Sequence, residues 1–146
     1  MVSERKLVLA LANKFQTYNP FELCDAMGIS IVWTPLNSSR GFYQRELETD
    51  TIYIDPSLPL PEQEFVCAHE LGHVLMHGGT NAIFLANHTY TCMNKYERRA
   101  NRFAAMLLWP DDGELIEFAD LSLEQLSTLM GIPEELVAWR YQQIGS

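Results

Sequence analysis

Two histidines and a glutamate have the spacing that zinc chemistry needs. They lie in His69-Glu70-Leu71-Gly72-His73, an HExxH pattern inside a predicted helix over residues 62–77. Four residues is close to one helical turn, so both imidazoles project from the same face and can reach one ion. Glu70 points about 100° further round the helix, beside the ion and not onto it. The pattern therefore predicts a zinc site with His69 and His73 as ligands and Glu70 as the general base that activates a water.

A catalytic zinc ion needs a third protein ligand, because its fourth position stays open for water or substrate. Glu97 is the best candidate, since it begins Glu97-Arg-Arg-Ala-Asn101 on the next predicted helix, residues 94–108. Asn101 lies one turn further along the same face, where it can orient a ligand histidine by accepting the other ring N–H. The alternative is a surface pair of histidines without a metal, and the Glu-x-x-x-Asn spacing favours the zinc site over it.

Peptide hydrolysis also needs a hydrogen-bond donor for the oxyanion, besides the metal. The sequence offers several candidates and does not choose among them: His77, His88, Tyr90, Tyr96 and Arg140. For His77 a structural role is favoured, as a cation near a helix end that interacts with the helix dipole.

A predicted strand over residues 40–45 is a candidate surface for the substrate. If this strand is a sheet edge, an extended peptide can add to it by backbone pairing. Gly41 would then permit close approach, and Phe42 or Tyr43 would offer a side-chain contact. A plain core strand is the alternative interpretation.

The elements that must position these residues are helices around a small sheet. Besides the two helices named above, helices are predicted over residues 4–17 and 21–27, with two short ones after residue 121. Strands are predicted over residues 29–34, 40–45 and 51–55, and their short connections favour antiparallel pairing. The sequence thus predicts an α+β fold with a small three-stranded antiparallel sheet, in one domain over residues 1–146. The C-terminal part of that domain, residues 111–146, has a helix-turn-helix outline.

The charge and apolar pattern exclude several classes of partner. A formal net charge of −9 argues against direct binding of nucleic acid or an anionic membrane, because phosphates attract basic surfaces. The C-terminal helix-turn-helix outline does not change this conclusion, since residues 111–146 carry eight acids and one base.

No stretch approaches the roughly 20 apolar residues of a membrane span, and residues 7–12 are too short a run for a signal peptide. Three cysteines without a CxxC pair are typical of reduced thiols, so a cytoplasmic protein is predicted.

The segments around these motifs resemble the ImmA/IrrE family of metallo-endopeptidases, which are of bacterial, prophage and mobile-element origin. The likeness lies in residues 65–77 and 97–110, and extends to residues 19–23, 28–29 and 40–43 and to the C-terminal pair of helices. It implies a compact zincin-like fold, with zinc on His69, His73 and Glu97 and the catalytic glutamate at Glu70. The chain departs from many relatives at Arg99, where they carry an acidic residue, and at Trp109, where they carry Met.

This resemblance also implies a substrate class. Family members with a defined role cleave a regulatory protein, often a helix-turn-helix repressor or an antitoxin-like partner. The alternative is a non-catalytic zinc-binding regulatory or interaction module, such as one half of a toxin-antitoxin-type pair. Glu70 favours the enzyme, because a structural zinc site needs no base and normally closes its fourth position.

Overall fold

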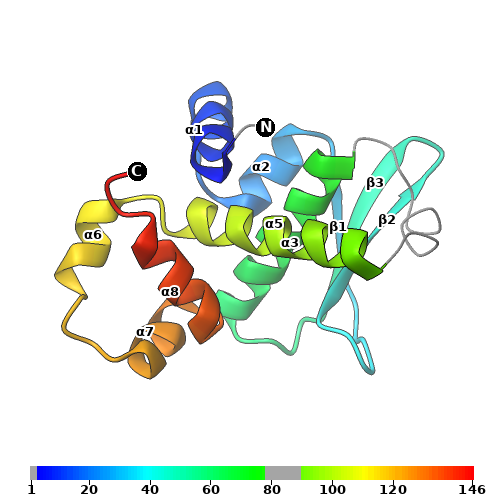
Figure 1. The fold of residues 1–146 in the computed structure, drawn as a ribbon. Coiled ribbons are helices and arrows are strands. Elements are labelled where there is room, and N and C mark those ends of the chain that lie inside the picture. Colours follow the sequence, from blue (N-terminus) through cyan, green and yellow to red (C-terminus); the bar gives the residue numbers. More distant parts are fainter. Residues whose placement is uncertain (1–2, 78–89) are drawn as a thin grey trace.

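Helices lie on one side of a small three-stranded sheet in this protein (Figure 1). The computed structural model describes residues 3–77 and 90–146, and the side chains of residues 3–76 and 95–146. Within these residues the helices are α1 (Glu4–Phe15), α2 (Pro20–Ala26), α3 (Leu60–His77), α5 (Tyr90–Leu108), α6 (Asp112–Glu117), α7 (Leu123–Met130) and α8 (Glu134–Gln142). The strands are β1 (Ser30–Trp33), β2 (Gly41–Glu46) and β3 (Thr49–Ile54). The predicted α+β class is confirmed.

The sheet has the order β1-β3-β2, with β3 in the centre. β2 and β3 form an antiparallel hairpin, as predicted, whereas β1 runs parallel to β3. The prediction of an all-antiparallel sheet is therefore wrong for β1. The reason is burial, because Ile52 and Ile54 of β3 are fully buried and this strand must take the central position. The connection between β1 and β2 then passes over the centre, so that β2 reaches the opposite edge.

Helix α3 packs between the sheet and α5, and two glycines let it approach both. A Cβ atom added to Gly41 in β2 would come within 2.3 Å of Cγ1 of Val66 in α3. A Cβ atom added to Gly72 in α3 would come within 3.1 Å of the Phe103 ring and 3.3 Å of Cα of Ala100, both in α5. These contacts lie in the main hydrophobic core, and they fix how closely α3 and α5 approach each other.

The C-terminal helices are attached to the rest of the chain through a buried arginine. The Arg140 side chain is 0% exposed; Nε donates to the carbonyl oxygen of Trp109 at 2.8 Å, and Nη2 donates to Oδ1 of Asp112 at 2.7 Å. Asp112 also accepts from Nη2 of Arg5 in α1 at 3.1 Å. Burial alone would raise the pKa of Asp112, but hydrogen bonds from the Gly145 N–H, Arg140 and Arg5 lower it to about 2. This network ties α6 and α8 to α1.

The helix pair expected near the C-terminus is present as α7 and α8, while α6 has no counterpart in the sequence-based prediction. α7 begins with a capping box between Ser122 and Gln125 and ends at Gly131, whose φ of 71° suits glycine. None of the described helices is long and apolar enough to cross a lipid bilayer.

Candidate metal centre

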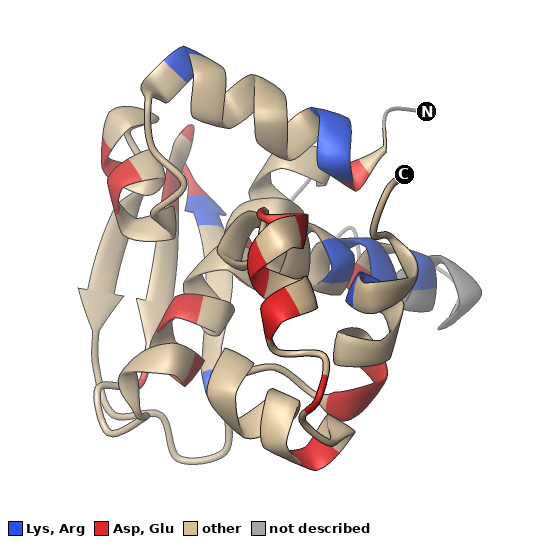
Figure 2. Ribbon diagram, turned by 90° about the vertical axis from the view of Figure 1, so that its left-hand side faces the viewer, with Lys and Arg blue, Asp and Glu red and all other residues tan. Residues whose placement is uncertain are grey.

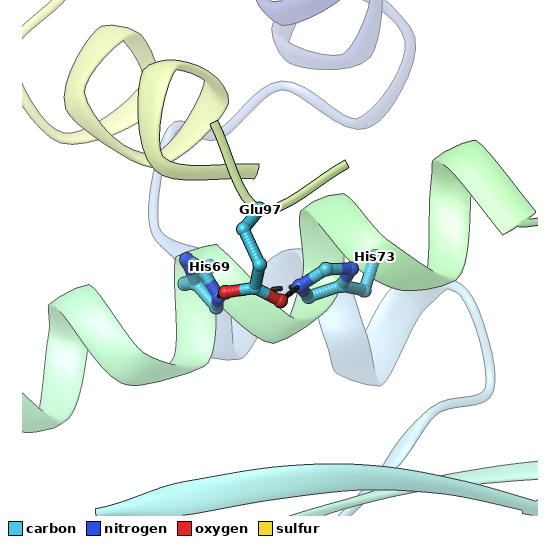
Figure 3. A group of neighbouring side chains, drawn as sticks. All are labelled: His69, His73 and Glu97. Atoms are coloured by element: carbon cyan, nitrogen blue, oxygen red, sulfur yellow. Dashed lines mark hydrogen bonds and ion pairs between the residues drawn. The ribbon is translucent and has the colours of Figure 1, made fainter. Parts of the chain in front are cut away.

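The two histidines of the HExxH pattern project from successive turns of α3 toward α5 (Figure 3). Their spacing of close to one turn puts both rings on the same face of the helix. Glu97 projects from α5, and its carboxylate lies between the two rings. Because Gly72 lets α5 come close to α3, the tip of a glutamate side chain on α5 can reach both imidazoles.

The donor atoms of His69, His73 and Glu97 form a tight cluster. Nε2 of His73 lies 2.6 Å from Oε1 of Glu97, and Nε2 of His69 lies 3.2 Å from Oε2 of the same carboxylate. The two Nε2 atoms are 3.2 Å apart. All three residues offer donor atoms within 4.8 Å of one another, which is the arrangement that a single metal ion requires.

The spacing of these donors suits a small tetrahedral ion. Ligands held at roughly 2.0–2.1 Å from a tetrahedral centre are separated by roughly 3.3–3.4 Å. The His69–His73 and His69–Glu97 separations of 3.2 Å are close to that value, whereas Nε2 of His73 and Oε1 of Glu97 are 2.6 Å apart, at hydrogen-bond distance. Two imidazole nitrogens and a carboxylate oxygen are also a known ligand set of catalytic zinc. The residues present therefore fit a zinc ion.

Hydrogen bonds and charge interactions join the three side chains of the cluster. Hydrogen bonds from His69 and His73 hold the pKa of the Glu97 carboxyl far below its usual value, although its side chain is 50% exposed. Burial alone would lower the pKa of His69, but Glu97, Glu70 and Asn101 together raise it. The carboxylates thus favour a cation at this place, which an imidazolium or a metal ion can supply.

Glu70 lies beside the cluster, where a general base belongs. Its Oε2 atom is 3.8 Å from Nε2 of His69, and its side chain is 13% exposed. Burial raises the pKa of Glu70, and the nearby histidines oppose this shift only in part. A carboxylate that has lost most of its water is a stronger base than one on the surface, so Glu70 is suited to proton transfer.

Asn101 lies next to His69 and contributes to raising its pKa. Among the described residues, the buried Nδ1 atom of His69 makes no hydrogen bond within the usual distance and angle limits. The orienting role of Asn101 stays a prediction.

Two other predicted contact residues have different roles in the structure. The Tyr43 hydroxyl donates to Oδ1 of Asp50 at 2.9 Å, and its ring is buried in the core. Burial and the bond to Asp50 raise the pKa of Tyr43 to about 12. Arg140 is fully enclosed and bound to Asp112. Both polar groups thus have partners inside the protein, and the role of Tyr43 or Arg140 as a substrate or oxyanion contact stays a prediction.

The remaining oxyanion candidates are not decided. His88 and the side chains of His77 and Tyr90 lie outside the described residues. Tyr96 is half-buried on α5.

Among the described strands β2 pairs with β3 alone, so the strand expected to bind substrate is an edge of the described sheet. Gly41 permits close approach, as predicted, but the group that approaches it is Val66 of α3. Phe42 is 41% exposed and stacks on Tyr53 with ring centroids 4.7 Å apart. One aromatic side chain of this edge strand is thus exposed.

Sequence reasoning missed two residues that shape the site. Gly72 sits inside the HExxH pattern at one of its two variable positions, yet it sets the approach of α5. Phe65 lies one turn before His69, with ring centroids 6.0 Å apart, and the Arg40 guanidinium lies 5.9 Å from the Phe65 centroid. The helical spacing of Phe65 and His69 was the signal that could have revealed this contact.

Comparisons with known proteins agree with this site. The model of the peptidase M78 family, described as the IrrE N-terminal-like domain, matches residues 24–142, which include the whole cluster. The chain is 34% identical over 131 residues to "Uncharacterized immunity region protein 2" of Bacillus phage phi105, covering 88% of this chain and 83% of the relative. It is 32% identical over 133 residues to "Metallopeptidase ImmA" of Bacillus subtilis strain 168, covering 89% and 79% respectively.

Proposed function

This chain belongs to the ImmA/IrrE family of metallopeptidases, and from this premise we propose that it is a zinc-dependent endopeptidase. The observation that carries the proposal is the meeting of two imidazoles and the Glu97 carboxylate beside the largely desolvated Glu70. We assign His69, His73 and Glu97 as the zinc ligands. Three protein ligands leave one position for water or substrate, which distinguishes a catalytic zinc site from a structural one.

Glu70 is the proton carrier in the proposed reaction. When bound, zinc supplies a Lewis acid that lowers the pKa of a water and polarises the scissile carbonyl. Glu70 takes a proton from the attacking water and later gives it to the amine that leaves. The raised pKa of Glu70 and its position 3.8 Å from His69 Nε2 support this role. Asn101 is a positioning residue, which would orient His69 by a hydrogen bond from the ring once the ligands are drawn to the metal.

The substrate is proposed to bind as an extended peptide along β2. Among the described strands one edge of β2 has no neighbour, so its outward backbone groups can pair with a further strand. The exposed Phe42 side chain offers a contact for a substrate side chain on the same face. Such backbone pairing would hold the peptide in one direction and register.

The substrate itself is proposed to be a regulatory protein, such as a helix-turn-helix repressor or an antitoxin-like partner. The relative from phage phi105 is named for an immunity region, which supports a regulatory target. The protein's net charge of −9 also suits a basic partner, and DNA-binding repressors commonly are basic. Direct binding of DNA by this chain is not part of the proposal.

The test is incubation of the zinc-loaded protein with any helix-turn-helix regulator that is encoded beside its gene. We expect specific fragments of the regulator with the wild type and none with Glu70→Gln, while both proteins hold equal zinc. Mass spectrometry of the fragments identifies the cleaved bond. Equal cleavage by Glu70→Gln would remove the proposed base. Equal zinc without cleavage by the wild type would favour a non-catalytic zinc-binding module instead.

A further inference from the structure

Four basic residues form a stripe on α5, which we call the α5 basic face: Lys95, Arg98, Arg99 and Arg102. Their spacing of three, four and seven residues places all four within an arc of roughly 100° on one side of the helix. Lys95 and Arg98 are exposed, and Arg99 and Arg102 are half-buried. Figure 2 shows the Lys and Arg positions of α5 close together, while acidic positions are spread over several other helices. The face thus holds four of the ten bases of an acidic chain.

Repulsion among the bases of the α5 basic face opposes the stability of this helix. Each base has like-charged neighbours one turn away, and such pairs destabilise a helix by roughly 0.2–0.5 kcal/mol each. The helix dipole offers no compensation, because the last turn of α5 has no base. Binding of a partner molecule therefore explains this cluster of bases better than a role in folding.

Within the described part of the chain, no ion pair joins the α5 basic face to an acidic residue. Among the described residues, the ion pairs of Arg and Lys with carboxylates involve other bases: Arg5, Arg40, Arg45 and Arg140. Residues 78–94, whose positions or side chains are not described, contain no Asp or Glu at all. The four positive charges are consequently available to a partner.

One member of the face is held in place by an aromatic ring. The Arg102 guanidinium lies 5.2 Å from the centroid of the Trp139 ring in α8. Such stacking restricts the side chain while leaving its N–H groups able to bind a carboxylate. A base that is already ordered loses less entropy on binding, so Arg102 is suited to act as an anchor.

We propose that the α5 basic face binds an acidic segment of the protein substrate. This inference rests on the proposed function, since it concerns the same substrate. Carboxylates complement the four charges, and the face is roughly 10 Å long, enough for three or four residues of an extended segment. A long DNA duplex fits less well, because the acidic remainder of the chain would repel its phosphates.

The docked segment differs from the segment that is cleaved. Glu97 projects from α5 roughly 150° away from the middle of the basic face. A substrate that occupies both places must pass around the helix, which needs at least roughly five extended residues between the two segments. Two linked contacts of modest strength then give the selectivity that a regulatory peptidase requires.

Fluorescence anisotropy tests this proposal with the full chain in its Glu70→Gln form, which keeps binding separate from cleavage. The probes are a labelled glutamate-rich decapeptide, its glutamine counterpart and a 20-base-pair DNA duplex, each at low and at physiological salt. The variant is Arg98→Gln/Arg99→Gln. Its matched control is Lys6→Gln/Lys14→Gln, which removes the same charge from exposed positions of α1.

We expect the glutamate peptide to bind and the α5 variant to weaken it about fivefold, since each exposed ion pair contributes roughly 0.5 kcal/mol. The α1 control should change the affinity less than about twofold, because those lysines lie outside the face. The proposal would be overturned if both variants lost the same affinity for the glutamate peptide, or if the glutamine peptide bound equally well. Tighter binding of the DNA duplex than of the glutamate peptide would also overturn it. If the zinc-loaded wild type cleaves its regulator but does not bind the glutamate peptide, only this inference fails. If the peptide binds and no regulator is cleaved, the docking face stands and the proposed function fails.

Discussion

Gly72 lies directly against Phe103, so that a Cβ atom at Gly72 would come within 3.1 Å of the Phe103 ring. This contact joins α3, which carries the two histidines, to α5, which carries Glu97. The approach of the two helices decides whether the glutamate reaches the imidazoles. The geometry of the candidate metal centre therefore depends on a residue that has no side chain.

A Gly72→Val substitution should separate α3 from α5. The added methyl groups have no room between the Phe103 ring and Ala100 Cα, and overpacking of this kind costs about 1–3 kcal/mol. We expect a lower midpoint of thermal unfolding and weaker zinc binding, measured by calorimetry and by competition with a chelator. Ala10→Val on the exposed side of α1 is the control for the helix propensity of valine, and it should leave zinc affinity unchanged.

Removal of a proposed ligand should abolish tight zinc binding. His73→Ala or Glu97→Ala leaves two donors, so we expect the zinc affinity to fall at least tenfold, as changes near metal sites commonly do. Elemental analysis after dialysis against a weak chelator measures the zinc content. Glu62→Ala, on the first turn of the same helix as the histidines, is the control. Full zinc content in Glu97→Ala would show that another group is the third ligand.

Asp112 should make stability depend on pH in the acid range. Its pKa is lowered from 3.8 to about 2 in the folded protein, so its contribution is complete above about pH 4 and is lost as the pH falls toward 2. Asp112→Asn leaves the buried Arg140 without its counter-charge and should cost about 3 kcal/mol at pH 7. We expect this difference from the wild type to shrink between pH 4 and pH 2 in urea unfolding experiments.

The neighbouring Asp111→Asn variant is the matched control for that experiment. Asp111 caps α6 by accepting the Gly113 N–H, and asparagine caps a helix as well as aspartate does. We therefore expect the free energy of unfolding to change by less than about 0.5 kcal/mol at neutral pH. If the difference in the free energy of unfolding between Asp112→Asn and the wild type did not depend on pH, the carboxylate charge would not be what holds Arg140.

Tyr43→Phe should affect stability and not catalysis. The substitution removes the hydrogen bond to Asp50 while keeping the buried ring, which should cost about 1 kcal/mol. Cleavage of the regulator should keep its rate at a temperature where both proteins are folded. A large loss of cleavage rate with unchanged stability would instead support Tyr43 as a substrate contact.

Much of the candidate site was predictable because helix geometry is local. The spacing of His69 and His73 forces both rings onto one face of α3 wherever the helix lies, and Glu70 must then point beside them. The next helix supplied Glu97, which the structure brings within 3.2 Å of both Nε2 atoms. The hairpin of β2 and β3 was also predictable, because the two strands are neighbours in the sequence. Its turn was not, because Leu47 and Glu48 have positive φ values, which are unusual for both residue types.

Relations between distant segments were not predictable from local patterns. The sequence offered Arg140 as one of several oxyanion donors, but its partners Asp112 and the Trp109 carbonyl are far away in the sequence. Tyr43 was a candidate substrate contact, but in the structure its hydroxyl donates a hydrogen bond to Asp50 on the other strand of the hairpin. The parallel pairing of β1 with β3 likewise depends on which strand is most buried, and that is settled only when α2 and α3 cover the sheet. The sequence by itself determined which side chains share a helical face, since that follows from a repeat of about 3.6 residues. The tertiary structure alone decided which of those faces meet, because their packing depends on contacts that no repeat along the chain encodes.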